Sequence, residues 1–68
     1  MKSMRWFEQT RMDWIAETLA IFGFINRDHL RRKFGISMPQ AAKDLGTFAR
    51  RHPKAMVYNS RTKRYEAT

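Results

Sequence analysis

The side chains of this sequence that could do chemistry are basic and polar, and they do not form a catalytic set. His29 and His52 lie 23 positions apart and the chain has no cysteine, so no metal site is expected. Neither a glycine-rich phosphate loop nor a nucleophile motif is present. We therefore expect a protein that is not an enzyme, with no catalytic residue, no metal and no cofactor.

The basic residues instead predict contact with a polyanion. The 68 residues include fourteen Lys and Arg against six Asp and Glu, a formal net charge of +8. Residues 1–22 hold three side chains of each sign, so the whole excess lies in residues 23–68. Such a field attracts nucleic acid or an anionic membrane surface, and solubility alone is the simpler alternative. Nine of the fourteen are Arg, which favours contacts to phosphates and bases.

Three side chains are the predicted base readers: Gln40, Lys43 and Thr47. On a helical wheel Lys43 lies opposite the apolar stripe of its helix, flanked by the other two. Gln can bond adenine, Thr can bond a base edge, and Lys can reach guanine or phosphate. Arg50 on the same face is predicted to contact phosphate. Gly46 costs about 1 kcal/mol in a helix interior, and a close approach of the backbone to DNA would explain it. A merely solvated helix face is the alternative.

Two basic groups are predicted to contact the DNA backbone. One lies on the helix before the base-reading helix, and the other lies at a hairpin tip, which can grip phosphates or enter the minor groove. Favourable charge in a last helical turn, or a solvated hairpin tip, explains either group taken alone. The predicted backbone contacts are Arg27, Arg31, Arg32, Lys33, Ser37 and Arg50, with Arg61, Lys63 and Arg64 on the hairpin.

The elements that must position these residues follow from periodicity and capping signals. An apolar stripe at helical spacing predicts a first helix over about residues 5–22, ended by Gly23. The stripe consists of Met12, Ile15, Leu19 and Phe22. Phe24 and Ile25 then form a segment too short for a helix, which predicts an extended strand.

Two short helices separated by a tight turn follow. Asn26 is the predicted cap of a helix over about residues 27–34, with Leu30 and Phe34 as its buried face and Gly35 at its end. The next helix covers about residues 38–52. Ser37 and Gln40 are predicted to form its capping box, with Pro39 in the first turn, and Ala41, Leu45 and Phe48 as its apolar stripe. Two short helices joined in this way are typical of a helix-turn-helix.

A hairpin completes the predicted fold. Aromatic and β-branched residues on both sides of a polar turn predict a hairpin, or wing, over about residues 56–67. The order helix–strand–helix–helix–strand–strand is that of an α+β winged helix-turn-helix. We expect residues 1–68 to form one such domain.

The first helix carries a second apolar strip, spaced mainly by seven residues: Met4, Phe7, Trp14 and Ile21. A core of this size does not easily cover two strips, and an exposed apolar strip often marks an interface. We expect a homodimer, or a partner, to dock on this strip. The alternative is that Phe7 and Trp14 fold onto the hairpin.

These motifs resemble the N-terminal winged helix of WYL-domain (DeoR-like) transcriptional regulators of bacteria and phages. The resemblance covers roughly residues 12–67, and the block Phe-Gly-Ile-Ser-x-x-Gln-Ala at residues 34–41 is its most specific part. It implies a domain that reads an operator as a dimer, with residues 37–47 as the recognition helix. Ala42 stands where a serine is expected, so one base or phosphate contact of the family is in question. Those regulators continue into a ligand-sensing domain, so this chain is either an excised domain or an autonomous small regulator, in which case no ligand response is implied.

The sequence thus predicts sequence-specific binding of double-stranded DNA by a small regulator, a repressor rather than an activator, located in the cytoplasm of a bacterial cell. No apolar run exceeds four residues, so no membrane-spanning segment is expected. Membrane-surface binding is not expected either, because the basic residues and the apolar strip lie on different elements. The alternatives are an architectural or excisionase-like phage DNA binder, which would bend DNA, and a winged-helix module that inhibits a host protein. RNA binding is weaker, because few exposed aromatic residues are expected.

Overall fold

The computed structural model describes residues 2–68, with side chains from residue 5 onward. Its elements follow the predicted winged helix order and confirm the α+β fold class. The first helix begins three residues before the expected start, and the third ends one residue earlier than expected. The elements are α1 (Lys2–Phe22), β1 (Phe24–Ile25), α2 (Arg27–Phe34), α3 (Met38–Arg51), β2 (Met56–Asn59) and β3 (Arg64–Ala67).

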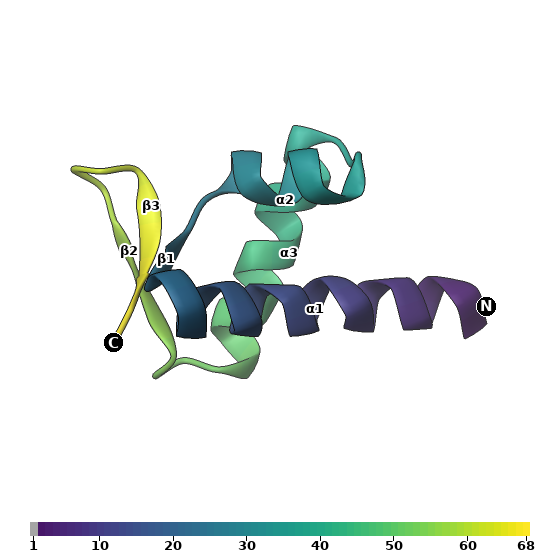
Figure 1. Cartoon of the computed structure of the whole chain (residues 1–68), viewed down its shortest axis with the longest axis horizontal. Helices are drawn as coiled ribbons and strands as arrows, with labels where there is room; N and C mark the ends of the chain where they lie inside the picture. The colour runs from purple at the N-terminus through teal and green to yellow at the C-terminus, as the bar shows by residue number, and fades with distance from the viewer. Residues whose placement is uncertain (1) are drawn as a thin grey trace.

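Helix α1 is the base on which the other elements lie. It runs along the long axis of a molecule of 36 × 21 × 20 Å, and α3 crosses it (Figure 1). The three strands stand at the end of the molecule away from the N-terminus, in the antiparallel order β1-β3-β2. The hairpin β2–β3 is therefore anchored through β1 to the segment that joins α1 and α2.

Local side-chain and glycine signals set the helix ends. Gly23 and Gly35 have φ values of 82° and 66°, the left-handed conformation that closes a helix. Asn26 caps α2 by accepting from the backbone N–H of His29, and the Asn26 backbone N–H donates to His29 Nδ1, which completes a capping box. Ser37 caps α3 by accepting from the backbone N–H of Gln40 at 3.2 Å. The capping box predicted there is half formed, because the Gln40 side chain bonds elsewhere.

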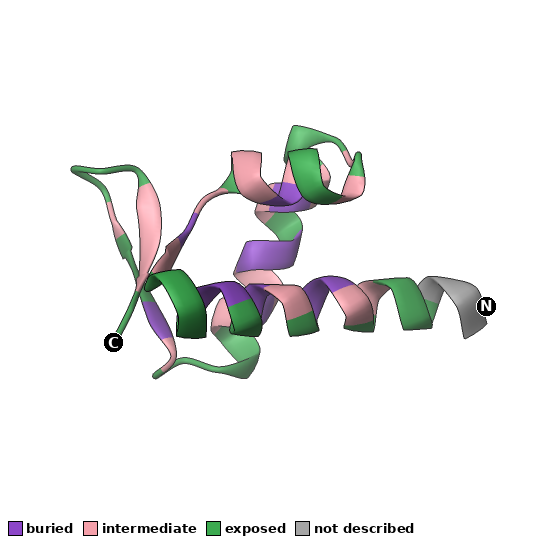
Figure 2. Cartoon of the chain, viewed as in Figure 1, coloured by how far each residue is buried: buried purple, intermediate pink, exposed green. Residues whose placement is uncertain are grey.

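The core lies where α1, α3 and β1 meet (Figure 2). Ile15, Ile25, Leu30 and Leu45 are fully buried. The predicted stripe of α1 is wrong at one place, because Phe22 is 67% exposed. Phe22 instead lines an open apolar hollow between α1 and α2, together with Trp14 and His29. The remaining core residues are Met12, Leu19, Ala41, Phe48 and Met56.

The second apolar strip of α1 is not one continuous free surface. The rings of Phe7 and Trp14 meet the ring of Phe34 edge-on, at centroid distances of 6.0 and 5.7 Å. These residues therefore fold onto α2 and not onto the hairpin, and Trp14 is half-buried against the core. Ile21 stays 65% exposed, and the side chain of Met4 lies outside the described residues.

Within residues 2–68, none of the helices has the length and apolar character that a bilayer crossing requires.

Two isoleucines of α1 give a matched test of this packing. Ile15→Ala removes a fully buried side chain and should lower the free energy of unfolding by about 2–5 kcal/mol. Ile21→Ala, on the same helix but exposed, should change it by no more than about 0.5 kcal/mol. Urea unfolding followed by circular dichroism measures both, and equal losses would contradict the described orientation of α1.

Candidate nucleic-acid interface

The outer face of α3 carries unpaired positive charge. Lys43 and Arg50 are exposed, and neither forms an ion pair with the described residues. The Arg50 guanidinium donates to the Thr47 hydroxyl at 3.2 Å, which ties these side chains together. Gly46 lies between them with open space around it, since an added Cβ would meet only the tip of the Arg50 side chain at 3.6 Å.

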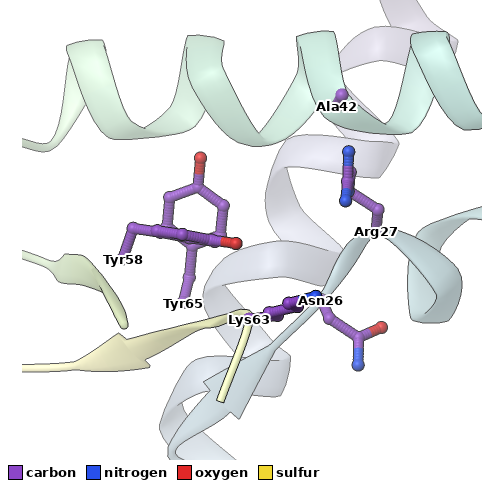
Figure 3. A pocket seen from close by; sticks show the side chains of 6 residues that line it. All are labelled: Asn26, Arg27, Ala42, Tyr58, Lys63 and Tyr65. Carbon is purple, nitrogen blue, oxygen red and sulfur yellow. The ribbon is translucent and has the colours of Figure 1, made fainter. Parts of the chain in front are cut away.

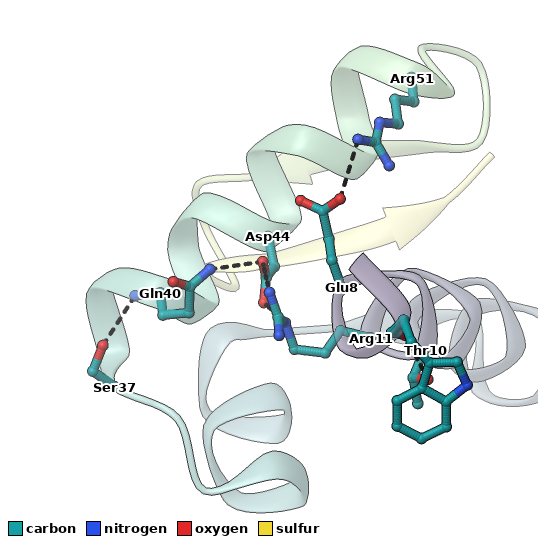
Figure 4. Close-up of polar contacts among 8 residues, drawn as sticks. Glu8, Thr10, Arg11, Ser37, Gln40, Asp44 and Arg51 are labelled. Carbon is teal, nitrogen blue, oxygen red and sulfur yellow. Dashed lines mark hydrogen bonds and ion pairs between the residues drawn. The ribbon is translucent and has the colours of Figure 1, made fainter. Parts of the chain in front are cut away.

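Gln40 is held toward α1 and does not stand freely on this face. Its amide nitrogen donates to Oδ1 of Asp44 at 2.9 Å, one turn further along α3 (Figure 4). The residue is half-buried. The amide oxygen and the second amide hydrogen keep their capacity for other bonds, so Asp44 fixes the direction of a side chain that can still make further contacts.

Asp44 is also the centre of a buried ion pair between α1 and α3. Arg11 Nε donates to Asp44 Oδ2 at 2.6 Å and Arg11 Nη2 donates to Oδ1 at 3.2 Å. Only 2% of Asp44 and 9% of Arg11 are exposed. The Arg11 guanidinium also lies 5.2 Å from the centroid of the Phe7 ring. The sequence reasoning missed this pair. The available signal was that both residues adjoin apolar stripe positions, Met12 and Leu45, on their own helices.

The predicted basic group of α2 divides into paired and unpaired members. Arg31 and Arg32 bond the carboxylate of Asp28 at 2.8 and 2.9 Å. The hydrogen bond from Arg31 is the main cause that lowers the pKa of Asp28, and the charge of Arg32 adds to it. Arg27 and Lys33 are exposed and have no ion pair among the described residues.

The wing tip is ordered by one asparagine. The side-chain oxygen of Asn59 accepts from the backbone N–H groups of Arg61 and Thr62. The backbone carbonyl of Asn59 accepts from the N–H of Lys63 at 2.7 Å. Lys63 is held in the left-handed region at φ 58°, which a non-glycine residue seldom adopts. The turn therefore presents the exposed Arg61 and Lys63 side chains from a defined backbone.

Arg64, the third predicted wing contact, is engaged within the sheet. Its Nε donates to Glu66 Oε2 at 2.9 Å, and its guanidinium lies over the Phe24 ring at 4.1 Å from the centroid. Hydrogen bonds from Asn59 and Arg64 lower the pKa of Glu66, so this carboxylate stays charged to a lower pH than a free glutamate. Arg64 thus joins β3 to β1.

A hollow of about 210 Å³ separates the wing from α3 (Figure 3). Its lining is Asn26, Arg27, Ala42, Tyr58, Lys63 and Tyr65.

The ion pairs divide the described cations into two sets. The five paired cations are Arg11, Arg31, Arg32, Arg51 and Arg64. The side chains without an ion pair to the described residues are Arg5, Arg27, Lys33, Lys43, Arg50, Lys54, Arg61 and Lys63. In the part of the chain with described side chains, no three His, Asp or Glu residues gather as a metal site would require. The available chemistry is the binding of anions by side-chain donors.

This chain is similar in sequence to known proteins. Residues 8–68 match the family model described as the BrxR transcriptional regulator winged helix-turn-helix domain. The chain is 38% identical over 64 residues to the DNA-binding transcriptional repressor CapW of Pseudomonas aeruginosa, an alignment that covers 94% of this chain and 21% of that protein. The CapW repressor of Stenotrophomonas maltophilia is 38% identical over 65 residues, 96% of this chain and 22% of its own. The CapW repressor of Escherichia coli is 36% identical over 64 residues, 94% of this chain and 21% of its own.

The chain spans about a fifth of the length of these curated relatives. The matches confirm the predicted resemblance to the N-terminal winged helix of WYL-domain transcriptional regulators.

The buried ion pair leads to a stability prediction. Asp44→Asn leaves the Arg11 guanidinium buried without a counter-charge and should cost about 3–5 kcal/mol, a large share of the stability of a small domain. Glu8→Gln breaks the half-exposed pair with Arg51, whose atoms are 3.5 Å apart, and should cost less than about 1 kcal/mol. Thermal unfolding of both variants measures the difference.

The double variant Arg11→Met, Asp44→Leu is the control for the charge itself. It removes both ions, so it should be more stable than Asp44→Asn. An Asp44→Asn protein as stable as Glu8→Gln would show that the pair does not hold α1 to α3.

Proposed function

The chain belongs to the family of BrxR transcriptional regulator winged helix-turn-helix domains, and we propose that it binds a specific double-stranded DNA operator and represses transcription by occupying it. Its relatives are named as DNA-binding transcriptional repressors, which supports this assignment. Residues 1–68 act in this proposal as one DNA-binding domain, with no cofactor and no small-molecule ligand.

The observation that carries the proposal is the free charge on the second helix of the helix-turn-helix. In such motifs the second helix enters the major groove, and the helix before it crosses the backbone. Helix α3 presents Lys43 and Arg50 without ion pairs to the described residues, while the cations nearest the core are neutralised. Charge left unpaired on this face supports a role in contacting the polyanion.

Base reading is assigned to Gln40, Lys43 and Thr47. Lys43 lies at the centre of the exposed face and reaches guanine or phosphate. Gln40 approaches from the α1 side in the orientation that Asp44 imposes, which reduces the entropy lost when it bonds a base. Thr47, bonded to Arg50, stands on the same side.

Phosphate contacts are assigned to the flanking elements. Ser37 accepts the Gln40 N–H, so its hydroxyl hydrogen is free to donate to a phosphate. Arg27 and Lys33 supply unpaired charge from α2, and Arg61 and Lys63 supply it from the wing. The cations that already share a carboxylate contribute less net charge, namely Arg31, Arg32 and Arg64.

The proposal includes a homodimer that forms through α1. The apolar surface available for this contact is smaller than the strip that the sequence predicts. Trp14 is half-buried against α2, and Phe7 stays 40% exposed although its ring also meets Phe34. The other exposed apolar side chains of α1 are Trp6, Ile21 and Phe22. A palindromic operator would require such a symmetric pair.

Selection of random DNA duplexes by the purified protein, followed by binding of the selected and a random duplex, tests the function. Lys43→Ala and Gln40→Ala should weaken binding to the selected duplex by about 5- to 150-fold and to random DNA much less. Arg61→Ala should weaken both duplexes alike and reduce the slope of log K against log salt by about 0.9.

A specificity ratio that Gln40→Ala leaves unchanged would contradict the recognition-helix assignment. Strong bending of the duplex, seen as position-dependent gel mobility, would instead favour the architectural alternative. If the selection enriches no duplex, the proposed function is wrong.

The substitution Gly46→Ala should affect the stability of the fold and the affinity for DNA in opposite directions. The added methyl of Gly46→Ala meets nothing closer than the Arg50 tip at 3.6 Å, and Ala is about 1 kcal/mol better than Gly inside a helix. The variant should therefore unfold at a higher temperature than the wild-type protein. If α3 lies close against the major groove, it should also bind the selected duplex more weakly, whereas unchanged binding would place the Gly46 backbone away from DNA.

A further inference from the structure

The hollow between the wing and α3 has the chemistry of an anion site. Its walls come from the start of α2, from helix α3, from strands β2 and β3, and from the turn between these strands (Figure 3). Arg27 and Lys63 line it, and neither has an ion pair with the described residues. No carboxylate is among its lining residues. A cation would find no counter-charge there, whereas an anion would find two positive charges.

Two tyrosines supply neutral donors to the same hollow. Tyr58 and Tyr65 are directly opposite each other in the β2–β3 register, so both rings stand on one face of the sheet. Their ring centroids are 5.0 Å apart in an edge-on arrangement. Neither hydroxyl forms a hydrogen bond with the described residues. In Figure 3 the two rings lie together on the wing side, and Arg27 and Ala42 lie across the hollow from them.

We propose that this hollow is the seat of one phosphate of the DNA backbone, held by the hydroxyls of Tyr58 and Tyr65 together with Arg27 and Lys63. Phosphate oxygens accept from phenol, guanidinium and ammonium donors, which are the donor groups gathered here. The proposal rests on the DNA binding proposed above and adds the two tyrosines, which the sequence left without a role.

The small side chain of Ala42 fits this arrangement. It forms the α3 wall of the hollow and has no polar group, so α3 leaves room for the phosphate without bonding it. The donors then come from the wing and from the start of α2. Because Asn59 fixes the turn that carries Lys63, the backbone from which this side chain reaches the hollow is defined.

Conservative substitutions of the two tyrosines test the proposed phosphate site, and the affinity for the selected duplex is the quantity measured. Tyr58→Phe and Tyr65→Phe each remove one hydroxyl and keep the ring pair, so the thermal midpoint should stay near that of the wild-type protein. Each should weaken binding about three- to tenfold, equally for selected and random duplexes. The salt slope should not change, because no charge is lost, whereas Lys63→Gln should reduce it by about 0.9.

Phosphate mapping identifies the seat directly. Replacing single phosphates of the duplex by neutral methylphosphonates should reveal one position per half-site at which the wild-type protein loses affinity. The double variant Tyr58→Phe, Tyr65→Phe should lose much of this sensitivity. Ser60→Ala, which removes a hydroxyl from the same hairpin outside the hollow, should retain the wild-type map.

The outcomes separate this inference from the proposed function. If the Tyr58→Phe, Tyr65→Phe variant binds all duplexes like the wild-type protein, or keeps the same methylphosphonate map, the proposed phosphate site is wrong. The proposed DNA binding is not affected by that result. A wild-type protein that binds no duplex overturns both.

Discussion

The bond between Arg11 and Asp44 is the constraint on which the rest of this small structure depends. A domain of about this size buries little apolar surface, so the way α1 meets α3 is not fixed by the core alone. The ion pair joins residues 33 positions apart, and its members are 2% and 9% exposed. Two buried charges tolerate few other arrangements, because any shift that separates them leaves an ion without water or partner. The same carboxylate orients Gln40, so one group links the scaffold helix to the face that we assign to DNA.

A net charge of +8 on 68 residues opposes compact folding, and the ion pairs show how the fold accommodates it. Asp28 draws two arginines along α2, and Glu66 draws Arg64 within the sheet. The lowered pKa values of Asp28 and Glu66 extend the ionised form of both carboxylates further into acidic solution. Among the described side chains, the cations without an ion pair lie on α2, α3 and the wing, apart from Arg5 on α1 and Lys54 between α3 and β2. A DNA surface is the counter-charge that would complete this distribution.

Whether the role of a residue could be predicted from the sequence depends on how far along the chain its partners lie. Asn26, Gly35 and Ser37 act as the sequence predicts, because capping depends on groups within three or four positions. Gln40 was predicted to close a capping box and instead bonds Asp44. Both partners are local, but the choice depends on Arg11, which holds Asp44 in place from another helix. Trp14 was expected to be free or to meet the hairpin, and it packs on Phe34 of α2.

The sequence by itself determined the winged helix order, the stripes that face the core and the concentration of positive charge after residue 22. These follow from periodicity, capping and composition, which act through near neighbours along the chain. Only the tertiary structure decided which cations are neutralised, how Gln40 points and where Tyr58 and Tyr65 come to face Arg27. Those outcomes depend on contacts between residues far apart in the chain. Such contacts form only when α1, the helix-turn-helix and the wing have packed around the same core.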